Sequence, residues 1–257
     1  MTQKDGTSHR IQSLQRAADM LERIRCERGC DVKEIMEAFE LPRSTAHIYL
    51  KTLEEMGFVE RKDGTYYLGL RSLEYGGYAR HQLNVYQIAR NMIDELATET
   101  QSVATLGCED DGQRVMLYRT EPVDAVSDNA PTGEYTEMHW TALGKVLLAE
   151  RTDEEVRTIV DQFGLPRATE HTITDLDELL ADLETTRSRG YAIEDEERVV
   201  GVRSIAVPIE VTDDLFDNVA ISIAGPKPKF ESERIESELV PMLKETANVI
   251  ELKQRHY

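Results

Sequence analysis

The chain has 257 residues and a formal net charge of −19, from 30 basic and 49 acidic side chains. That length suits two domains, and a hydrophobic fraction of 40% can build a core in each. The sequence contains no apolar run of about 18 residues and no apolar signal core near its start, which excludes a predicted membrane span or secretory leader. Three cysteines, Cys26, Cys30 and Cys108, form no disulfide framework, so we expect a cytoplasmic protein with free thiols.

The negative charge is unevenly distributed. Residues 1–80 carry 13 basic and 13 acidic side chains, so the rest of the chain holds the whole excess. A segment that contacts phosphates must lack an excess of acidic residues, because acidic residues near a phosphate backbone oppose binding. Only nine of the 30 basic residues are lysine, and this acidic, lysine-poor composition is typical of a halophile. An ordinary acidic cytosolic protein is the alternative.

The first 40 residues predict two helices. A first amphipathic helix is indicated by apolar residues at helical spacing, namely Ile11, Leu14, Ala18, Leu21 and Ile24. Its last turn is expected to hold Cys26 and Cys30, four positions apart. Asp31 can cap a second, short helix that ends before a tight turn at residues 40–42.

The third predicted helix has two contrasting faces. Pro42 suits its first position and Gly57 its end. One face would bury Ala46, Leu50 and Leu53. The other face carries Ser44, His47, Ile48 and Lys51, and a helix in the major groove of DNA needs short polar groups and cations in this arrangement.

A hairpin follows this helix. Residues 57–61 and 65–68 read as strands, and Lys62-Asp63-Gly64 joins them with the Asp-Gly turn signal. Helix, helix, recognition helix and hairpin predict a winged helix-turn-helix, for which the alternative is a packing module without a nucleic-acid role. We expect Arg43, Ser44, Thr45, His47 and Lys51 to contact the major groove, and Arg61 and Lys62 to contact the backbone or minor groove beside the wing.

Two further helices are predicted at residues 70–82 and 85–98, and they suit a linker that also dimerises. Gly76-Gly77 would be either a hinge or the end of the first of them. The expected domains are residues 1–69 for DNA binding, 70–84 as a helical linker, and 85–257.

The third predicted domain mixes strands and helices. Strands are expected at 103–107, 115–119, 191–194, 201–211 and 219–224, with a turn at 109–112. Helices are expected at 140–150, 154–163, from the cap Thr174-Asp175 to Arg189, and at 232–254. Because no regular βαβ alternation exists, the pattern favours an α+β fold with an antiparallel or mixed sheet.

Along nearly its whole length, the chain resembles a known family of transcriptional regulators, the IclR family. The resemblance rests on the helix-turn-helix motif at 41–53 with Met56-Gly57 and Tyr67-Leu68-Gly69, on His139-Trp140-Thr141-Ala142-Leu143-Gly144-Lys145, and on residues 189–197, 201–209 and 220–226. It implies an N-terminal winged helix-turn-helix, a helical linker and a C-terminal GAF-like effector-binding domain. It also implies a homodimer or homotetramer on double-stranded operator DNA, with no cofactor.

The resemblance implies an effector site for a small organic acid. The positions carried over by motif are Ala142, Leu143, Glu194, Ser204, Ser222 and Ala224. The residues themselves agree with an acid, because free N–H groups at the helix start near Ala142 favour an anion and the two serines can offer hydroxyls. Arg203 is a further candidate cation. Alternatively, Ser204 and Ser222 are ordinary strand serines, and Glu194 is a solvated member of the acidic run 194–197.

Two departures limit what the resemblance implies. Ile48 stands where the family usually has arginine, so the operator sequence cannot be transferred. Ala224 and Glu194 stand where members often have serine and aspartate, so the ligand cannot be transferred either.

Two other classes of function are the alternatives. A hydrolase could use His139 and Ser204, but the sequence has no G-x-S-x-G elbow, Walker loop, G-x-G-x-x-G or H-E-x-x-H motif. A metal-sensing regulator could use His139 with nearby carboxylates. We therefore expect a ligand-responsive, sequence-specific DNA-binding regulator rather than an enzyme.

Overall fold

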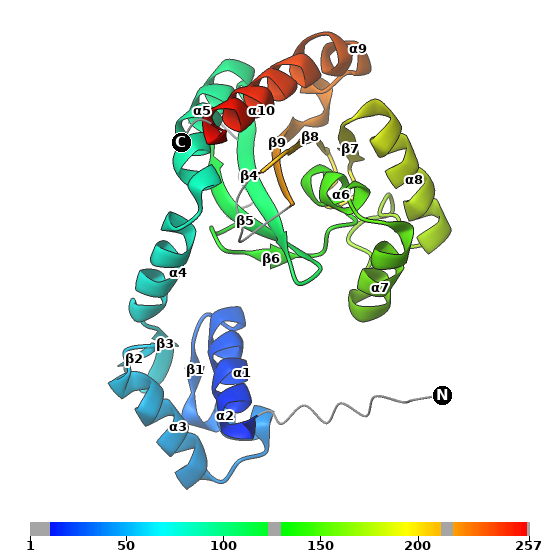
Figure 1. Cartoon of the computed structure of the whole chain (residues 1–257). Coiled ribbons are helices and arrows are strands. Elements are labelled where there is room, and N and C mark those ends of the chain that lie inside the picture. The colour runs from blue at the N-terminus through cyan, green and yellow to red at the C-terminus, as the bar shows by residue number, and fades with distance from the viewer. Residues whose placement is uncertain (1–10, 123–129, 212–217, 256–257) are drawn as a thin grey trace, which may run out of the picture. The chain divides into compact units, whose positions relative to one another are not determined.

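The computed structural model describes residues 11–122, 130–211 and 218–255, which form two compact units (Figure 1). The first unit ends at Ala79 and the second begins at Arg80. This division falls inside the segment 70–84 predicted as a linker. Nowhere in the described ranges is a helix both long and apolar enough to cross a membrane.

The N-terminal unit contains three helices and a small antiparallel sheet. The helices are α1 (Gln12–Cys26), α2 (Val32–Phe39) and α3 (Arg43–Glu55). The strands β1 (Cys30–Asp31), β2 (Val59–Lys62) and β3 (Thr65–Leu68) pair in the order β1-β3-β2. The core lies between helices and sheet and is built from Met20, Ile24, Ile35, Ala46, Leu50, Leu53, Val59 and Tyr66.

Local sequence signals account for the starts and ends of α2 and α3. Asp31 forms a capping box, in which the Glu34 N–H donates to Asp31 Oδ1 at 2.9 Å and the Asp31 N–H donates to Glu34 Oε2 at 2.7 Å. This confirms the predicted cap. Pro42 is the N-cap of α3 and not its first helical residue, because its ψ of 145° is extended and the helix begins at Arg43. Gly57, at φ 78°, follows the helix end as predicted.

The wing turn has the predicted geometry. Asp63 and Gly64 both have positive φ, 52° and 93°, as a type I′ hairpin turn requires.

The placement of Cys30 on the first helix is wrong. Arg28 and Gly29 have φ values of 57° and 128°, so the chain leaves α1 and Cys30 pairs with Tyr66 in the sheet.

Helix α4 (Arg71–His81) runs through Gly76 and Gly77, so no helix ends at the glycine pair. A hinge there stays a prediction.

The C-terminal unit is built on a six-stranded sheet. Its strands are β4 (Val103–Asp110), β5 (Gln113–Thr120), β6 (Tyr135–Thr136), β7 (Ala192–Asp195), β8 (Val202–Ile209) and β9 (Val219–Pro226). They pair in the order β6-β5-β4-β9-β8-β7, and every neighbouring pair is antiparallel. This confirms the α+β class, whereas the two-residue strand β6 was not predicted.

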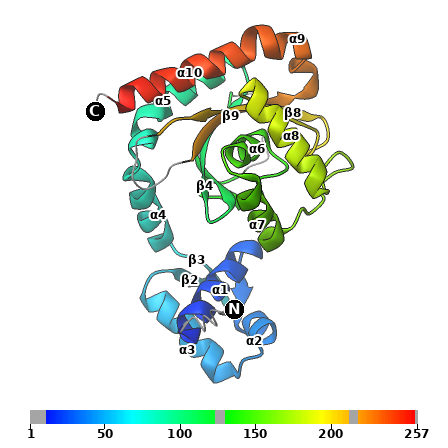
Figure 2. The same cartoon turned by 45° about the vertical axis from the view of Figure 1, so that its right-hand side comes forward.

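The two faces of the sheet are covered differently (Figures 1 and 2). Helices α5 (Asn84–Thr100) and α10 (Val240–Gln254) lie side by side on one face. The other face carries α6 (Ala142–Ala149), with α7 (Asp153–Phe163) and α8 (Leu176–Arg189) outside it. A 3-10 turn (Lys227–Lys229), the short α9 (Ser232–Arg234) and a π turn (Ile235–Leu239) lead into α10.

Side-chain size separates the two faces. Strands β8 and β9 present Ile205, Val207, Ile209, Val219, Ile221 and Ile223 to α5 and α10. The alternate positions of the same sheet give Ala192, Ala206 and Ala220 to the α6 side. Helix α6 can therefore sit close to the sheet.

Two glycines allow this close approach. A Cβ on Gly107 would come within 3.0 Å of Leu143, and a Cβ on Gly144 would come within 2.2 Å of the Met138 carbonyl oxygen. The Gly144 N–H donates to Thr141 Oγ1 at 3.0 Å, which caps the helix. The start of α6 is thus held against both the sheet and the loop before it.

We expect Gly144→Ala to destabilise the C-terminal unit by about 1–3 kcal/mol, because the methyl group has no space and the obstacle is backbone. The measurement is the free energy of unfolding of the full chain by denaturant titration. Gly76→Ala in α4 is the matched control, since a Cβ there meets nothing within 4 Å. Equal stability of the two variants would contradict the close packing.

Candidate functional site

The outer face of α3 is accessible. Arg43, Ser44, His47 and Lys51 are exposed, and Thr45 is half-buried. The opposite residues Ala46, Leu50 and Leu53 are buried as predicted. Ile48 is 67% exposed, although it is apolar. Its side chain therefore adds little buried area to the core of this unit and remains accessible on the outer face of α3.

Cations flank this face. Lys51 Nζ lies 3.8 Å from Glu55 Oε1, an exposed pair of a kind that stabilises little. Arg61 and Lys62 are exposed at the end of β2, and the Arg61 guanidinium lies over the Tyr66 ring at 5.6 Å. The seven residues predicted to contact DNA therefore all belong to α3 or to the wing hairpin.

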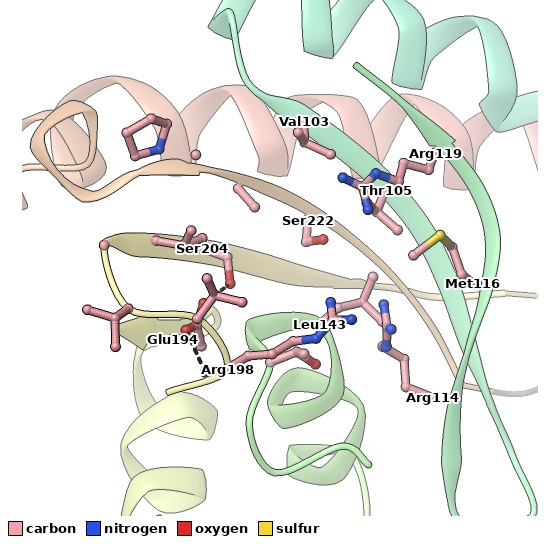
Figure 3. A pocket seen from close by; sticks show the side chains of 18 residues that line it. Val103, Thr105, Arg114, Met116, Arg119, Leu143, Glu194, Arg198, Ser204 and Ser222 are labelled. Atoms are coloured by element: carbon pink, nitrogen blue, oxygen red, sulfur yellow. Dashed lines mark hydrogen bonds between the residues drawn. The ribbon is translucent and has the colours of Figure 1, made fainter. Parts of the chain in front are cut away.

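The C-terminal unit holds a cavity of about 400 Å³ between the sheet and the start of α6 (Figure 3). Five of the six predicted effector residues line it: Leu143, Glu194, Ser204, Ser222 and Ala224. Ala142 does not line it, because its side chain is fully buried in the core between α6 and the sheet. The motif positions are thus brought together from α6 and three strands.

Glu194 is a buried acceptor and not a solvated residue, since its exposed fraction is 3%. Its Oε2 accepts from Ser204 Oγ at 2.7 Å, and its Oε1 accepts from the N–H groups of Glu197 at 2.9 Å and Arg198 at 3.3 Å. Burial raises the pKa of Glu194, and these donors act in the opposite direction. The solvated alternative is therefore wrong.

The two serines have different environments. Ser204 donates its proton to Glu194, so its oxygen is left as an acceptor toward the cavity. Ser222 lies on β9, where it pairs with Ala206 on one side and Thr105 on the other. Both serines are buried and line the cavity.

Three arginines that were not predicted from the sequence line the cavity, namely Arg114, Arg119 and Arg198. Arg203, the cation that was predicted, is not among the lining residues. Arg203 Nη2 is 2.6 Å from Asp195 Oδ2, and its Nη1 donates to the Phe230 carbonyl at 2.7 Å.

A β-bulge explains why two arginines of one strand share the cavity. In the β4–β5 ladder, Leu106 pairs with Tyr118 and Gly107 pairs with Met116, so Leu117 is an extra residue. A residue added to one strand reverses the in-and-out alternation beyond it.

The side chains follow this reversal. Leu117 belongs to the core under α5, and Tyr118 turns the same way and donates to Asp94 Oδ1 at 2.8 Å. Arg114 and Arg119 are five positions apart and would face opposite sides of a regular strand. With the bulge, both face the cavity.

A buried ion cluster lies behind the cavity. Lys145 Nζ is 2.6 Å from Glu197 Oε1 and 3.1 Å from Asp182 Oδ2, and it donates to the Ile193 carbonyl at 3.5 Å. Burial raises the pKa of Glu197 to about 7, although the Lys145 ammonium acts to lower it. The cluster ties α6 to α8 and to the segment after β7 that carries Glu197 and Arg198.

His139 is a structural residue in this unit. It is buried, its Nε2 lies 3.0 Å from the Pro166 carbonyl oxygen, and burial lowers its pKa. The Ser204 proton goes to Glu194, so no His139–Ser204 pair supports a hydrolase. Within the part of the chain that the structure describes, no cluster of three or more His, Cys, Asp or Glu side chains is placed to hold a metal.

Comparison with known proteins agrees with both halves of this arrangement. The family model "IclR helix-turn-helix domain" matches residues 13–63, and "Bacterial transcriptional regulator IclR C-terminal" matches residues 78–252. A probable HTH-type transcriptional regulator, ArcR of Halobacterium salinarum, is 32% identical and covers 97% of this chain and 96% of its own length.

Solved structures show the same architecture. The IclR protein of Thermotoga maritima has a TM-score of 0.73 and 30% identity, over 95% of this chain and 99% of that one. An IclR homolog from Microbacterium hydrocarbonoxydans, solved with 4-hydroxybenzoate, has a TM-score of 0.80 and 25% identity, over 95% of this chain and 100% of that one.

Together, the helix-turn-helix unit and the α+β unit with its cavity define a DNA-binding transcriptional regulator and not an enzyme. The chain belongs to the IclR family, which confirms the resemblance drawn from its motifs. The halobacterial relative agrees with the acidic, lysine-poor composition.

We expect protonation of Glu197 to stabilise the folded chain. Its folded-state pKa of about 7 lies above the ordinary value of 4.5, so the folded state binds more protons between these values. The free energy of unfolding should therefore fall as pH rises from about 5 to about 8. Glu197→Gln has no proton to lose and should show a smaller fall, measured by denaturant titration at fixed salt.

Lys145, Asp182 and Glu194 surround Glu197 and also remain in Glu197→Gln, so they contribute to the pH dependence of both the wild type and the variant. Glu196→Gln is the matched control, because Glu196 is an adjacent carboxylate paired with Lys227 whose pKa is lowered. An identical pH slope in wild type and Glu197→Gln would contradict the assignment.

Proposed function

We propose that this regulator binds a palindromic operator through α3 and the wing, and that a small organic acid in the C-terminal cavity controls this binding in the cytoplasm. The observation that carries the DNA-binding surface is the accessible outer face of α3, with an exposed isoleucine among short polar and basic side chains. The observation that carries the effector site is the cavity in which five motif residues meet.

The contacts expected on DNA follow from side-chain chemistry. Arg43, Ser44 and Thr45 belong to the first turn of α3, the part of a recognition helix that reaches base edges. His47 and Lys51 follow on the same face. Ile48 can read only a thymine methyl group by contact, so we expect an A·T pair at that position of each half-site.

A dimer is supported by exposed apolar side chains in the N-terminal unit. Leu14 on α1 is exposed, as is Ile11 just before that helix. Leu73 and Tyr78 on α4 are also exposed, and Leu70, just before α4, is 74% exposed. A monomer rarely exposes so many large apolar groups on one small unit. A second copy that covers them would also supply the second recognition helix for a palindrome.

The effector class follows from the cavity walls. Three guanidiniums line it, and guanidinium geometry matches a carboxylate. The relative from Microbacterium hydrocarbonoxydans was solved with an aromatic acid, 4-hydroxybenzoate. We extend only the broader class, a small organic acid, to this chain.

We expect Lys51→Glu to abolish operator binding while the fold survives, because the change reverses an exposed charge beside the phosphates. A pull-down of genomic fragments at two to about three molar KCl, a salt range chosen for a halophile, identifies the operator, and mobility shift measures affinity. Lys253→Glu, also exposed but on α10, is the charge-matched control. Undiminished binding by folded Lys51→Glu would place the recognition helix elsewhere.

We expect a bound organic acid to raise the melting temperature of the full chain, with a gain of about 2.7 kcal/mol at 100 times Kd. Ala224→Leu should remove the shift by filling the cavity, whereas Ala181→Leu on the exposed side of α8 should retain it. If no acid in a broad panel moves the melting curve, the effector proposal fails and the DNA-binding function stands.

A further inference from the structure

We propose that the β-bulge in β5 couples the cavity to helix α4, so that packing against the cavity side of the bulge fixes the last turn of α4. The inference rests on the proposed function in one respect, that this cavity is the effector site. It adds the route by which occupancy of the cavity reaches the helix that leads to the DNA-binding unit.

The bulge places four consecutive residues of β5 on two sides of the sheet. Met116 and Arg119 line the cavity, and both are labelled in Figure 3. Leu117 and Tyr118 turn to the other face, where they pack in the core that includes α5. One short stretch of strand therefore contacts both the ligand space and the helices on the opposite face.

The extra residue of the bulge is held from outside the sheet. Across the described strands β4 and β5, the register skips Leu117, which has no Cα partner in β4. Its carbonyl oxygen accepts a hydrogen bond from Arg80 Nη1 at 3.4 Å. Arg80 is half-buried and is the first residue of the C-terminal unit. Helix α4 thus supplies a donor to the point at which the β4–β5 pairing is interrupted.

An aromatic pair next to the bulge fixes Arg80. Its guanidinium lies over the Tyr86 ring at 4.6 Å, a cation–π contact. The Tyr86 ring meets the Tyr118 ring edge-on at 5.9 Å, and the Tyr118 hydroxyl donates to Asp94 Oδ1 at 2.8 Å. Arg80, Tyr86 and Tyr118 therefore connect the end of α4 and the start of α5 with the bulge.

Helix α4 depends on these contacts at its C-terminal end. It begins in the first unit, and its last two residues, Arg80 and His81, belong to the second. Within one chain, none of its described residues is buried. Gly76 and Gly77 lie one turn before Arg80, and glycine is a poor helix former. The last turn is also tied to α5 by Gln87 Nε2, which donates to the His81 carbonyl at 3.1 Å. Loss of the Arg80 contact should therefore let this turn open more often.

Occupancy of the cavity acts on the same point. Because Leu117 lacks a partner in β4, the position of its carbonyl depends on how firmly its neighbours in β5 are held. Met116, directly before it, is 2% exposed and lines the cavity. A ligand that packs against Met116 fixes the bulge and keeps the carbonyl in place for Arg80. Such a ligand favours the held state of the last turn over the released state.

Hydrogen exchange of the full chain tests this coupling without a ligand. Mass spectrometry at fixed salt and pH follows the amides of residues 78–83, which report the last turn of α4. We expect Arg80→Met, which keeps an apolar stem but removes every donor, to speed their exchange about tenfold. Met116→Ala should speed it about threefold from the cavity wall, because the bulge loses packing.

Two comparisons assign the route to Arg80. Leu143→Ala shortens the wall that α6 gives to the same cavity, and it should leave the exchange of residues 78–83 unchanged. In a chain that already carries Arg80→Met, Met116→Ala should add nothing further, because the contact that transmits its effect is gone. Arg157→Met, on the exposed side of α7, is the matched control for loss of an arginine.

Met116→Leu changes the shape of this side chain at similar volume, so it replaces Met116→Ala if that variant fails to fold, with the same order of effects. The proposal is overturned if Arg80→Met leaves the exchange unchanged. It is also overturned if the Met116 variant acts equally with and without Arg80, or if Leu143→Ala matches its effect.

These outcomes require neither operator nor effector, so they are separate from the tests of the proposed function. An acid that raises the melting temperature of the wild type should also slow the exchange of residues 78–83, and should not slow it in Arg80→Met. Binding without that slowing contradicts the coupling and leaves the effector site in place. If no acid binds, the effector proposal fails, and the exchange of the variants still decides whether the bulge holds α4.

Discussion

The close contact between α6 and the sheet is the constraint on which the C-terminal unit depends. Gly107 and Gly144 lack the methyl groups that would clash with Leu143 and the Met138 carbonyl. Alanines on β7, β8 and β9 also leave room for α6 to pack closely on the sheet. Because the helix is fixed there, its N-terminal residues Thr141 and Leu143 form one wall of the cavity, and β4, β5, β8 and β9 contribute residues to the others. The packing that anchors α6 therefore also shapes the space for a ligand.

Elements with local signals could be predicted from the sequence. The cap at Asp31, the Asp-Gly wing turn and the buried stripe of α3 each depend on residues within one turn or one hairpin. Strands β1 and β6 could not be predicted, because two residues are too few to show the alternation of apolar and polar side chains that marks a strand. These strands are defined by their pairing with β3 and β5. The same limit explains Cys30, which helical spacing alone assigned to α1.

Some of the residues that line the cavity could be predicted, and others could not, for a related reason. Its motif residues could be found by resemblance, but the arginines depend on geometry that the sequence does not express. Alternation along β5 places Arg114 and Arg119 on opposite faces, and only the extra residue Leu117 brings them together. Glu194 shows the converse case. In the sequence it is one of four consecutive acids, and burial beside Ser204 makes it the acceptor of the site.

Charge therefore serves the two units in different ways. The acidic, lysine-poor composition is typical of proteins that work at high salt, where attraction between exposed cations and phosphates is screened. Under the proposed function, recognition by α3 at such salt depends more on fit at the base edges, including the exposed Ile48, than on net charge. Arg114 and Arg119 in the cavity are only 4% and 11% exposed, so salt screens their charges less than it screens charges at the surface. Under the proposed function, charge can therefore contribute to selecting an effector in the same salt that weakens the attraction to DNA.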